Sequence, residues 1–247
     1  MTELPELELA AADRVLHVLS VVARAATPLT AAQLVQASGL SRSALYRQLA
    51  RLKKFGLLQE QAGLYAPGPL CLQLAAGFEQ SSNLVHVVRP FLEQLSQLTQ
   101  ESAGLIVASH AHAMCLAMAE STQSLRCSFA EGQSVPLQRG ASALCLLAHL
   151  PAAQRNALLT QQHGPDGAPR EQAQQQLQQI RERGYVVTVG EVDAGVWGCS
   201  APIFGARRRA VGALSLMAPA QRAAHQQDLW IAHTLAMADR ISRALDD

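Results

Sequence analysis

Hydrophobic positions in the first quarter of the chain recur at helical spacing and then change to short runs. One apolar-sided segment spans about residues 31–39, a second spans 41–54, and two short runs follow within 57–65. Apolar residues at i, i+4 and i+7 form one stripe on a helix, whereas short runs bounded by turn residues are typical of strands. The pattern predicts a helix, a turn, a second helix and a two-stranded wing.

Both predicted helices are preceded by a residue that favours a helix start. Thr30 and Ser41 stand directly before them, and a hydroxyl at this position accepts a hydrogen bond from an unpaired amide of the first turn. In the second helix Leu45, Leu49 and Leu52 share one face. We therefore expect the opposite face of that helix to lie in solvent.

That opposite face is small, basic and hydrogen-bonding, with no acidic residue between positions 41 and 55. Small residues let a helix enter the DNA major groove, and an arginine can fork to guanine or to a phosphate. Hydroxyls and free amides at a helix start suit phosphate contacts. The candidate DNA-binding residues are Thr30, Ser41, Arg42, Ser43, Tyr46, Arg47, Arg51 and Lys54.

The distribution of charge decides between a DNA-binding face and an ordinary solvated helix. Residues 11–68 contain seven Lys or Arg and two Asp or Glu, whereas residues 69–247 contain thirteen and fourteen. The whole chain carries a net charge of only +1. Attraction for a polyanion is therefore local to the first segment, and double-stranded DNA is the partner we expect.

The remainder of the chain alternates between helical and strand-like patterns. At 247 residues and 49% hydrophobic composition, two domains with a core each are expected. Strands followed by helices, then strands and a closing helix, predict an α+β domain with an antiparallel sheet. The expected helices are 70–78, 84–99, 142–149, 152–159, 171–183 and 221–245, and the expected strands are 105–108, 114–118, 125–129, 185–188, 195–204 and 210–217.

Several other classes of protein are disfavoured by the sequence. The five cysteines form no CxxC pair, so we expect reduced core thiols. His110 and His112 have no acidic or cysteine companion, and we expect no metal and no cofactor. The start MTELPELELA has no basic signal-peptide region, and no apolar run approaches the roughly 18–20 residues of a membrane span. We expect a soluble, cytoplasmic protein with no membrane partner.

Six segments together resemble the IclR family of transcriptional regulators, over nearly the whole chain. Three lie in the first part, ADRVLHVLSVVA at 12–23, the helix-turn-helix at 29–58, and LYAPGPLCLQLA at 64–75. Three lie in the second, at 136–151, 180–204 and 211–220. The first set is specific in combination, while the second matches mainly in order and spacing.

The resemblance implies a winged helix-turn-helix joined by a linker helix to a GAF-like effector-binding domain. We expect these parts at residues 9–68, 69–81 and 82–247, the last also serving oligomerisation. The expected protein is a homodimer or homotetramer on a pseudo-palindromic operator, sensing a small organic effector, with RNA polymerase as a further candidate partner. Symmetry of protein and operator makes physical sense, because one short helix supplies little specificity alone.

The resemblance also implies a position for the effector pocket. It falls at the start of the helix after residue 140 and on the strands near residues 188 and 198, where the amides of the helix start would suit a carboxylate or another electron-rich group. The candidate effector-binding residues are Arg139, Gly140, Ala141, Ser142, Thr188, Trp197, Gly198, Cys199 and Ser200.

The chain departs from the family pattern at this pocket. Thr188 stands where an acid is common, and Trp197-Gly198 replaces an Arg-Cys pair, with the cysteine moved to Cys199. These changes favour an aromatic or larger effector over a small keto acid, if Trp197 stacks on it. The alternative is that Trp197 belongs to the core or to a dimer contact. Strand alternation places Cys199 and Ser200 on opposite faces.

Three functions remain open on the sequence alone. A ligand-responsive repressor of a local catabolic or metabolic operon is the main hypothesis, and an activator of the same family is its closest alternative. A thiol-dependent GAF-like enzyme with a DNA-docking domain would need Cys199 as nucleophile, although no His or acid lies near it in sequence. An architectural DNA binder would have no effector. We expect a protein that is not an enzyme.

Overall fold

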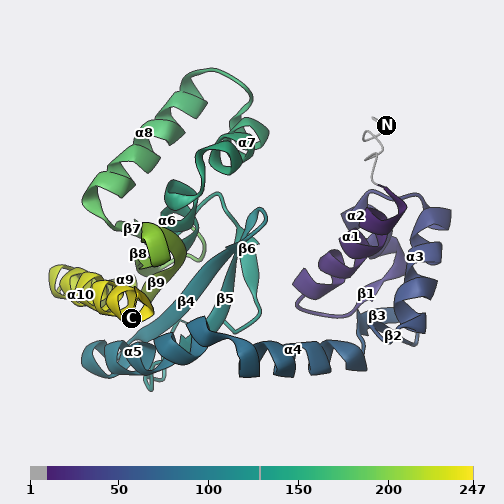
Figure 1. The fold of residues 1–247 in the computed structure, drawn as a ribbon, viewed down its shortest axis with the longest axis horizontal. Helices are drawn as coiled ribbons and strands as arrows, with labels where there is room; N and C mark the ends of the chain where they lie inside the picture. Colours follow the sequence, from purple (N-terminus) through teal and green to yellow (C-terminus); the bar gives the residue numbers. More distant parts are fainter. Residues whose placement is uncertain (1–9, 128, 247) are drawn as a thin grey trace. The chain divides into compact units, whose positions relative to one another are not determined.

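The structure is a computed structural model that describes residues 10–127 and 129–246. The chain divides into two compact units, the first ending at Ser82 and the second beginning at Asn83. Figure 1 shows the ribbon of both units.

The first unit contains the predicted helix-turn-helix and wing. Its three-stranded antiparallel sheet has the order β1-β3-β2. Strand β1 was not predicted, because it has only two residues and exists through its pairing with β3. The elements are α1 (Ala11–Arg24), β1 (Leu29–Thr30), α2 (Ala31–Ser38), α3 (Arg42–Lys54), β2 (Leu58–Gln61), β3 (Leu64–Pro67) and α4 (Pro69–Ser81).

A side-chain hydroxyl caps the N-terminus of each helix of the motif, as the sequence predicted. The Thr30 hydroxyl accepts a bond from the Gln33 amide at 3.3 Å, and the Gln33 side chain accepts one from the Thr30 amide at 2.8 Å. This is a reciprocal capping box. Ser41 Oγ accepts a bond from the Ala44 amide at 3.4 Å. Gly39, with φ of 67°, ends α2 in the left-handed conformation.

The core of the first unit consists of the apolar faces of α1, α2 and α3. Leu45, Leu49 and Leu52 are buried there with Val18 and Leu34. The predicted leucine face is therefore confirmed, and its burial turns the other side of α3 outward. Helix α4 is different, because none of its residues is buried in the described structure.

The second unit is a six-stranded antiparallel sheet covered on both faces, which confirms the predicted α+β class (Figure 1). The strand order is β6-β5-β4-β9-β8-β7. Helices α5 and α10 cover one face, and α6, backed by α7 and α8, covers the other. The elements are α5 (Asn83–Thr99), β4 (Ser102–Ser109), β5 (His112–Ala119), β6 (Ser134–Pro136), α6 (Ala141–His149), α7 (Ala152–His163), α8 (Ala168–Arg183), β7 (Val186–Val189), β8 (Val196–Gly205), η1 (Ala206–Arg208), β9 (Arg209–Pro219), α9 (Ala220–Ala223) and α10 (Gln227–Asp246).

Two predicted elements need correction. No strand forms at residues 125–127 or at 129, and residue 128 lies outside the described residues. One reason is that the Leu125 carbonyl accepts a bond from Arg222 Nη2 at 2.8 Å, so it has a partner outside any sheet. The edge strand is instead β6, paired with β5. The closing helix is interrupted between α9 and α10, and the turn brings both Ala223 and Trp230 into the core.

The end of α6 gathers positive side chains around its free carbonyls. Arg181 Nη1 donates to the Ala148 carbonyl, and Arg155 Nη1 donates to the Leu150 carbonyl, both at 3.1 Å. His149 Nδ1 lies 2.8 Å from the Cys145 carbonyl. Cations at a helix C-terminus satisfy carbonyls that have no partner in the helix. Burial, followed by the charges of Arg181 and Arg155, lowers the pKa of His149 below its usual 6.5.

This environment predicts a pH-dependent contribution of His149 to stability. Because the folded chain binds the proton less readily than the unfolded chain, the contribution is complete above the unfolded-state pKa and is lost as the pH falls below it. The free energy of unfolding should therefore decrease between pH 7.5 and pH 5, and less steeply in His149→Gln. Urea titrations of both proteins across that range measure the difference, and parallel pH profiles would contradict the assignment.

Candidate functional site

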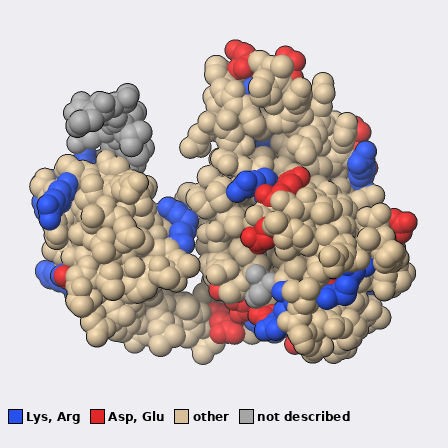
Figure 2. Space-filling view, turned by 180° about the vertical axis from the view of Figure 1, so that it is seen from behind, with Lys and Arg blue, Asp and Glu red and all other residues tan. Residues whose placement is uncertain are grey.

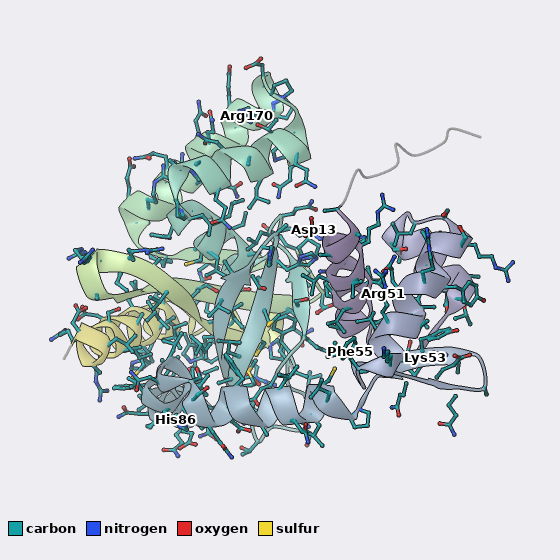
Figure 3. The ribbon with its side chains drawn as sticks, turned by 45° about the vertical axis from the view of Figure 1, so that its right-hand side comes forward. Asp13, Arg51, Lys53, Phe55, His86 and Arg170 are labelled. Atoms are coloured by element: carbon teal, nitrogen blue, oxygen red, sulfur yellow. The ribbon has the colours of Figure 1, made fainter. Side chains whose placement is uncertain are left out.

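Helix α3 presents the predicted DNA-binding face to solvent. Ser43, Tyr46, Arg47, Ala50 and Arg51 are all exposed, whereas the leucines on the other side are buried. The hydroxyls of Thr30 and Ser41 act as helix caps. Figure 3 labels Arg51 on this helix. The eight candidates therefore lie at the starts of α2 and α3 and along the outer side of α3, and their contact with DNA stays a prediction.

The cations of α3 differ in how far they are already paired. Lys53 Nζ lies 2.5 Å from Glu60 Oε2 on the wing, and the hydrogen bond raises the pKa of Lys53 and lowers that of Glu60. Within the described residues, no carboxylate forms an ion pair with Arg42, Arg47 or Lys54. Lys53 thus attaches the wing to the helix, while the three other charges remain available for phosphates.

The first unit also shows its charge imbalance on the surface. In Figure 2 it lies on the left, with several blue patches and little red, whereas red and blue are mixed over the second unit. A surface of one sign raises the local concentration of an oppositely charged partner and is most effective at low salt. The asymmetry inferred from the sequence is therefore present on the face shown.

The second unit contains a cavity of about 520 Å³ at the start of α6. Strands β8 and β9 form one side of it, and residues 125–127, 129 and 191–196 contribute further walls. The structure brings six of the nine predicted effector residues together around this space. They are Gly140, Ala141, Ser142, Thr188, Gly198 and Ser200.

A pair of buried hydroxyls lines the cavity. Ser200 on β8 and Ser215 on β9 are cross-strand neighbours, and their Oγ atoms lie 2.7 Å apart. Beside them, Gly198 lies against the start of α6, where an added Cβ would make ordinary contact with the Cβ of Ala141 at 3.5 Å. Ser215 was missed by the sequence reasoning. Ser215 can be recognised as a partner of Ser200 only from the register between β8 and β9.

A loop between β7 and β8 holds the start of α6. The Glu191 carboxylate accepts a hydrogen bond from the Gly140 amide at 2.7 Å. Gly140 has φ of 91°, and a Cβ added there would lie only 2.6 Å from Val192 Cγ2. Both Glu191 and Val192 line the cavity, and neither was predicted. Nothing in a local pattern relates them to a helix fifty residues earlier.

Three predicted effector residues do not reach this cavity, and the expectation for them is corrected. Trp197 is 2% exposed and packs against Trp230 in the core under α5 and α10, with ring centroids 5.8 Å apart. Cys199 is buried in the same core, which confirms that it and Ser200 point to opposite faces. Arg139 is exposed and outside the lining. The reason is the strand period of two, which sends Trp197 and Cys199 away from Gly198 and Ser200.

Burial also determines the state of the thiols. It raises the pKa of Cys199 to about 12 and that of Cys115 to about 12. A thiol in such surroundings stays protonated at neutral pH, and the thiolate is the nucleophilic form. Within the described part of the chain, no group of three or more His, Cys, Asp or Glu is placed to hold a metal ion. None of the described helices has the length and apolarity needed to cross a membrane.

Models of two protein domains match the chain and together cover most of it. The IclR helix-turn-helix domain matches residues 11–62, and the C-terminal domain of the bacterial transcriptional regulator IclR matches residues 78–243. The chain belongs to the IclR family. It is accordingly a DNA-binding transcriptional regulator, with an effector-binding domain in its second unit.

Individual relatives agree with this assignment. The HTH-type transcriptional regulator KipR of Bacillus subtilis is 26% identical over 195 residues, covering 76% of this chain and 78% of KipR. The transcriptional repressor IclR of Escherichia coli is 26% identical over 219 residues, covering 85% of this chain and 80% of that protein. The crystal structure of an IclR-family regulator from Brucella abortus has a TM-score of 0.80 at 18% identity, covering 99% and 96%, and shows the same fold.

The contact between Val192 and Gly140 gives a test of how this IclR-family cavity is built. Gly140→Ala should destabilise the protein, because the new methyl would meet Val192 and the backbone conformation disfavours an L side chain. Gly132→Ala is the matched control, since Gly132 has φ of 83° with nothing within 4 Å. We expect the control to cost about 1–2 kcal/mol for conformation alone, and Gly140→Ala to cost about 1–3 kcal/mol more for overpacking.

Urea unfolding of the two variants beside the unmodified protein measures the comparison. Equal losses of unfolding free energy would mean that Val192 moves aside without cost. In that case the loop 190–195 would not be held against α6 by this contact.

Proposed function

We propose that this IclR-family protein is a repressor of a local catabolic or metabolic operon. It binds a pseudo-palindromic operator as a dimer or a dimer of dimers, and a small organic effector in the cavity of the second unit changes its affinity for DNA. The observation that carries the proposal is the exposed basic face of α3, where Arg42, Arg47 and Lys54 form no ion pair among the described residues. The same chain contains a cavity of about 520 Å³.

The DNA-binding part of the proposal is supported by the chemistry of α3. Arg42 and Arg47 lie in its first half and Lys54 at its end. The helix begins at Ser41, where amides and hydroxyls are available to a phosphate. Two copies related by a two-fold axis would place two such helices on symmetric half-sites. A regulator of chromosomal DNA would act in the cytoplasm, with RNA polymerase as its candidate protein partner.

The choice of a repressor rests on a relative. The Escherichia coli protein that is 26% identical is named a transcriptional repressor. An activator of the same family is the alternative, since the outcome depends on where the operator lies relative to the promoter. A transcription assay with the operator and its promoter, with and without this protein, distinguishes the two by the direction of change.

An enzymatic function has less support. The thiol-dependent alternative requires Cys199 as nucleophile, but Cys199 is fully buried on the face opposite the cavity. Its raised pKa, near 12, also keeps it protonated. We therefore propose that the cavity binds its ligand without converting it. Trp197 lies in the core and cannot stack on a ligand in the cavity, so it gives no support for an aromatic effector.

The role of α3 can be tested with the DNA upstream of the protein's own gene. Arg47→Ala should weaken specific binding by about 1–3 kcal/mol if Arg47 contacts a base. Lys53→Ala is the matched control on the same helix, and it should cost less because Lys53 is already paired with Glu60. Fluorescence anisotropy with operator and scrambled duplexes at fixed salt gives both affinities.

The pattern of loss separates three outcomes. A loss confined to the operator identifies Arg47 as a base-reading residue, and an equal loss on both duplexes identifies a phosphate contact. Unchanged binding of Arg47→Ala to both duplexes would remove α3 from the proposed interface.

A further inference from the structure

We propose that the cavity of the second unit takes an uncharged organic molecule bearing an oxygen, rather than a carboxylate. This inference rests on the proposed function, because it concerns the effector of the same site. It comes from the charges, hydroxyls and walls of the described cavity.

The charged side chains around the cavity disfavour an anion. Glu191 and Asp193 both line it. Among the described lining residues, Arg126 is the single cation, and its Nε lies 3.1 Å from Glu120 Oε2. A ligand carboxylate would share Arg126 with Glu120, in a cavity lined by two other carboxylates. Like charges that share one cavity repel, and because Glu191 and Asp193 are exposed, water screens part of this repulsion.

One of the free amides at the start of α6 is already bonded within the protein. A helix N-terminus attracts anions through its free amides and its dipole. Here the Glu191 carboxylate takes the Gly140 amide at 2.7 Å, beside the first turn of α6. A second full negative charge at this helix start would meet Glu191. A neutral oxygen would still benefit from the remaining amides without that repulsion.

The hydroxyl pair offers a neutral hydrogen-bonding position. Ser200 and Ser215 are 0% and 3% exposed, and one of their two O–H groups is used in the bond between them. A pair of hydroxyls joined in this way has one O–H left to donate. An alcohol, ketone or amide oxygen is a suitable acceptor for it. Thr188 lines the same cavity with a third hydroxyl.

The other walls are largely apolar, which defines the body of the ligand. Phe129, Val135, Leu216 and Met217 line the cavity together with small residues of the loop before β8. A few polar groups in an apolar cavity orient a ligand whose remaining surface is hydrophobic. A volume of about 520 Å³ accommodates a molecule with one ring or a short branched chain.

Three molecules of nearly equal shape test the preference. Benzamide is neutral, benzoate is an anion and benzamidine is a cation at neutral pH. We expect benzamide to bind the full-length protein at least about fivefold more tightly than benzoate, the factor for one uncompensated charge in a partly solvated site. Isothermal titration calorimetry gives the affinities, and thermal shifts provide a second reading because binding stabilises the folded state.

Two variants identify the groups responsible. Asp193→Asn removes one carboxylate and keeps the side-chain size, so benzoate should bind severalfold better while benzamide changes little. Ser200→Ala combined with Ser215→Ala removes both hydroxyls of the pair, so benzamide should bind severalfold more weakly. Urea unfolding of each variant verifies that it is folded before the affinities are compared.

The outcomes are separable from those of the proposed function. Benzoate binding as tightly as benzamide overturns the inference, and so does the absence of binding of either at about 10 mM. Tighter binding of benzamidine than of benzamide also overturns it, since the ligand class would then be cationic. Operator binding, measured without ligand, tests the regulator itself, so a failure here leaves that result unchanged.

Discussion

The structure of the second unit depends on the alternation of side chains along strand β8. Successive residues of this strand face two different environments, the core on one side and the cavity on the other. Trp197 and Cys199 enter the core beneath α5 and α10, whereas Gly198 and Ser200 face the cavity. The large residues provide packing on one side, and the small ones leave space on the other. A shift of register by one residue would place the tryptophan in the cavity and a serine in the core.

The local signals for the first unit were strong enough to predict it. Capping hydroxyls, a leucine stripe and a terminal glycine determine where α2 and α3 begin and end and which face is buried. Each of these signals acts within a few residues, so it can be read from the local sequence. Strand β1 and the pairing of Lys53 with Glu60 were beyond this reasoning. Both depend on which segments pair with the strands of the wing, and the local sequence of one segment does not identify its partner.

The cavity was predicted in part, and the errors have identifiable causes. Trp197 was placed in it by resemblance, although alternation alone assigns Trp197 to the face of Cys199 and not to that of Ser200. The alternation of side chains along the strand is enough to assign Trp197 to the core face. Ser215 and Glu191 required the register of β8 with β9 and the path of the loop before β8. Such long-range pairings are set by packing across the whole sheet, so a single sequence does not reveal them.

The burial of Trp197 beside Trp230 has a practical consequence for following this protein in solution. These are the two tryptophans of the chain, and both lie in the second unit. Trp197 also lies between Val196 and Gly198, two residues that line the cavity. Intrinsic tryptophan fluorescence is therefore an optical signal from the effector-binding domain alone, without a contribution from the helix-turn-helix unit.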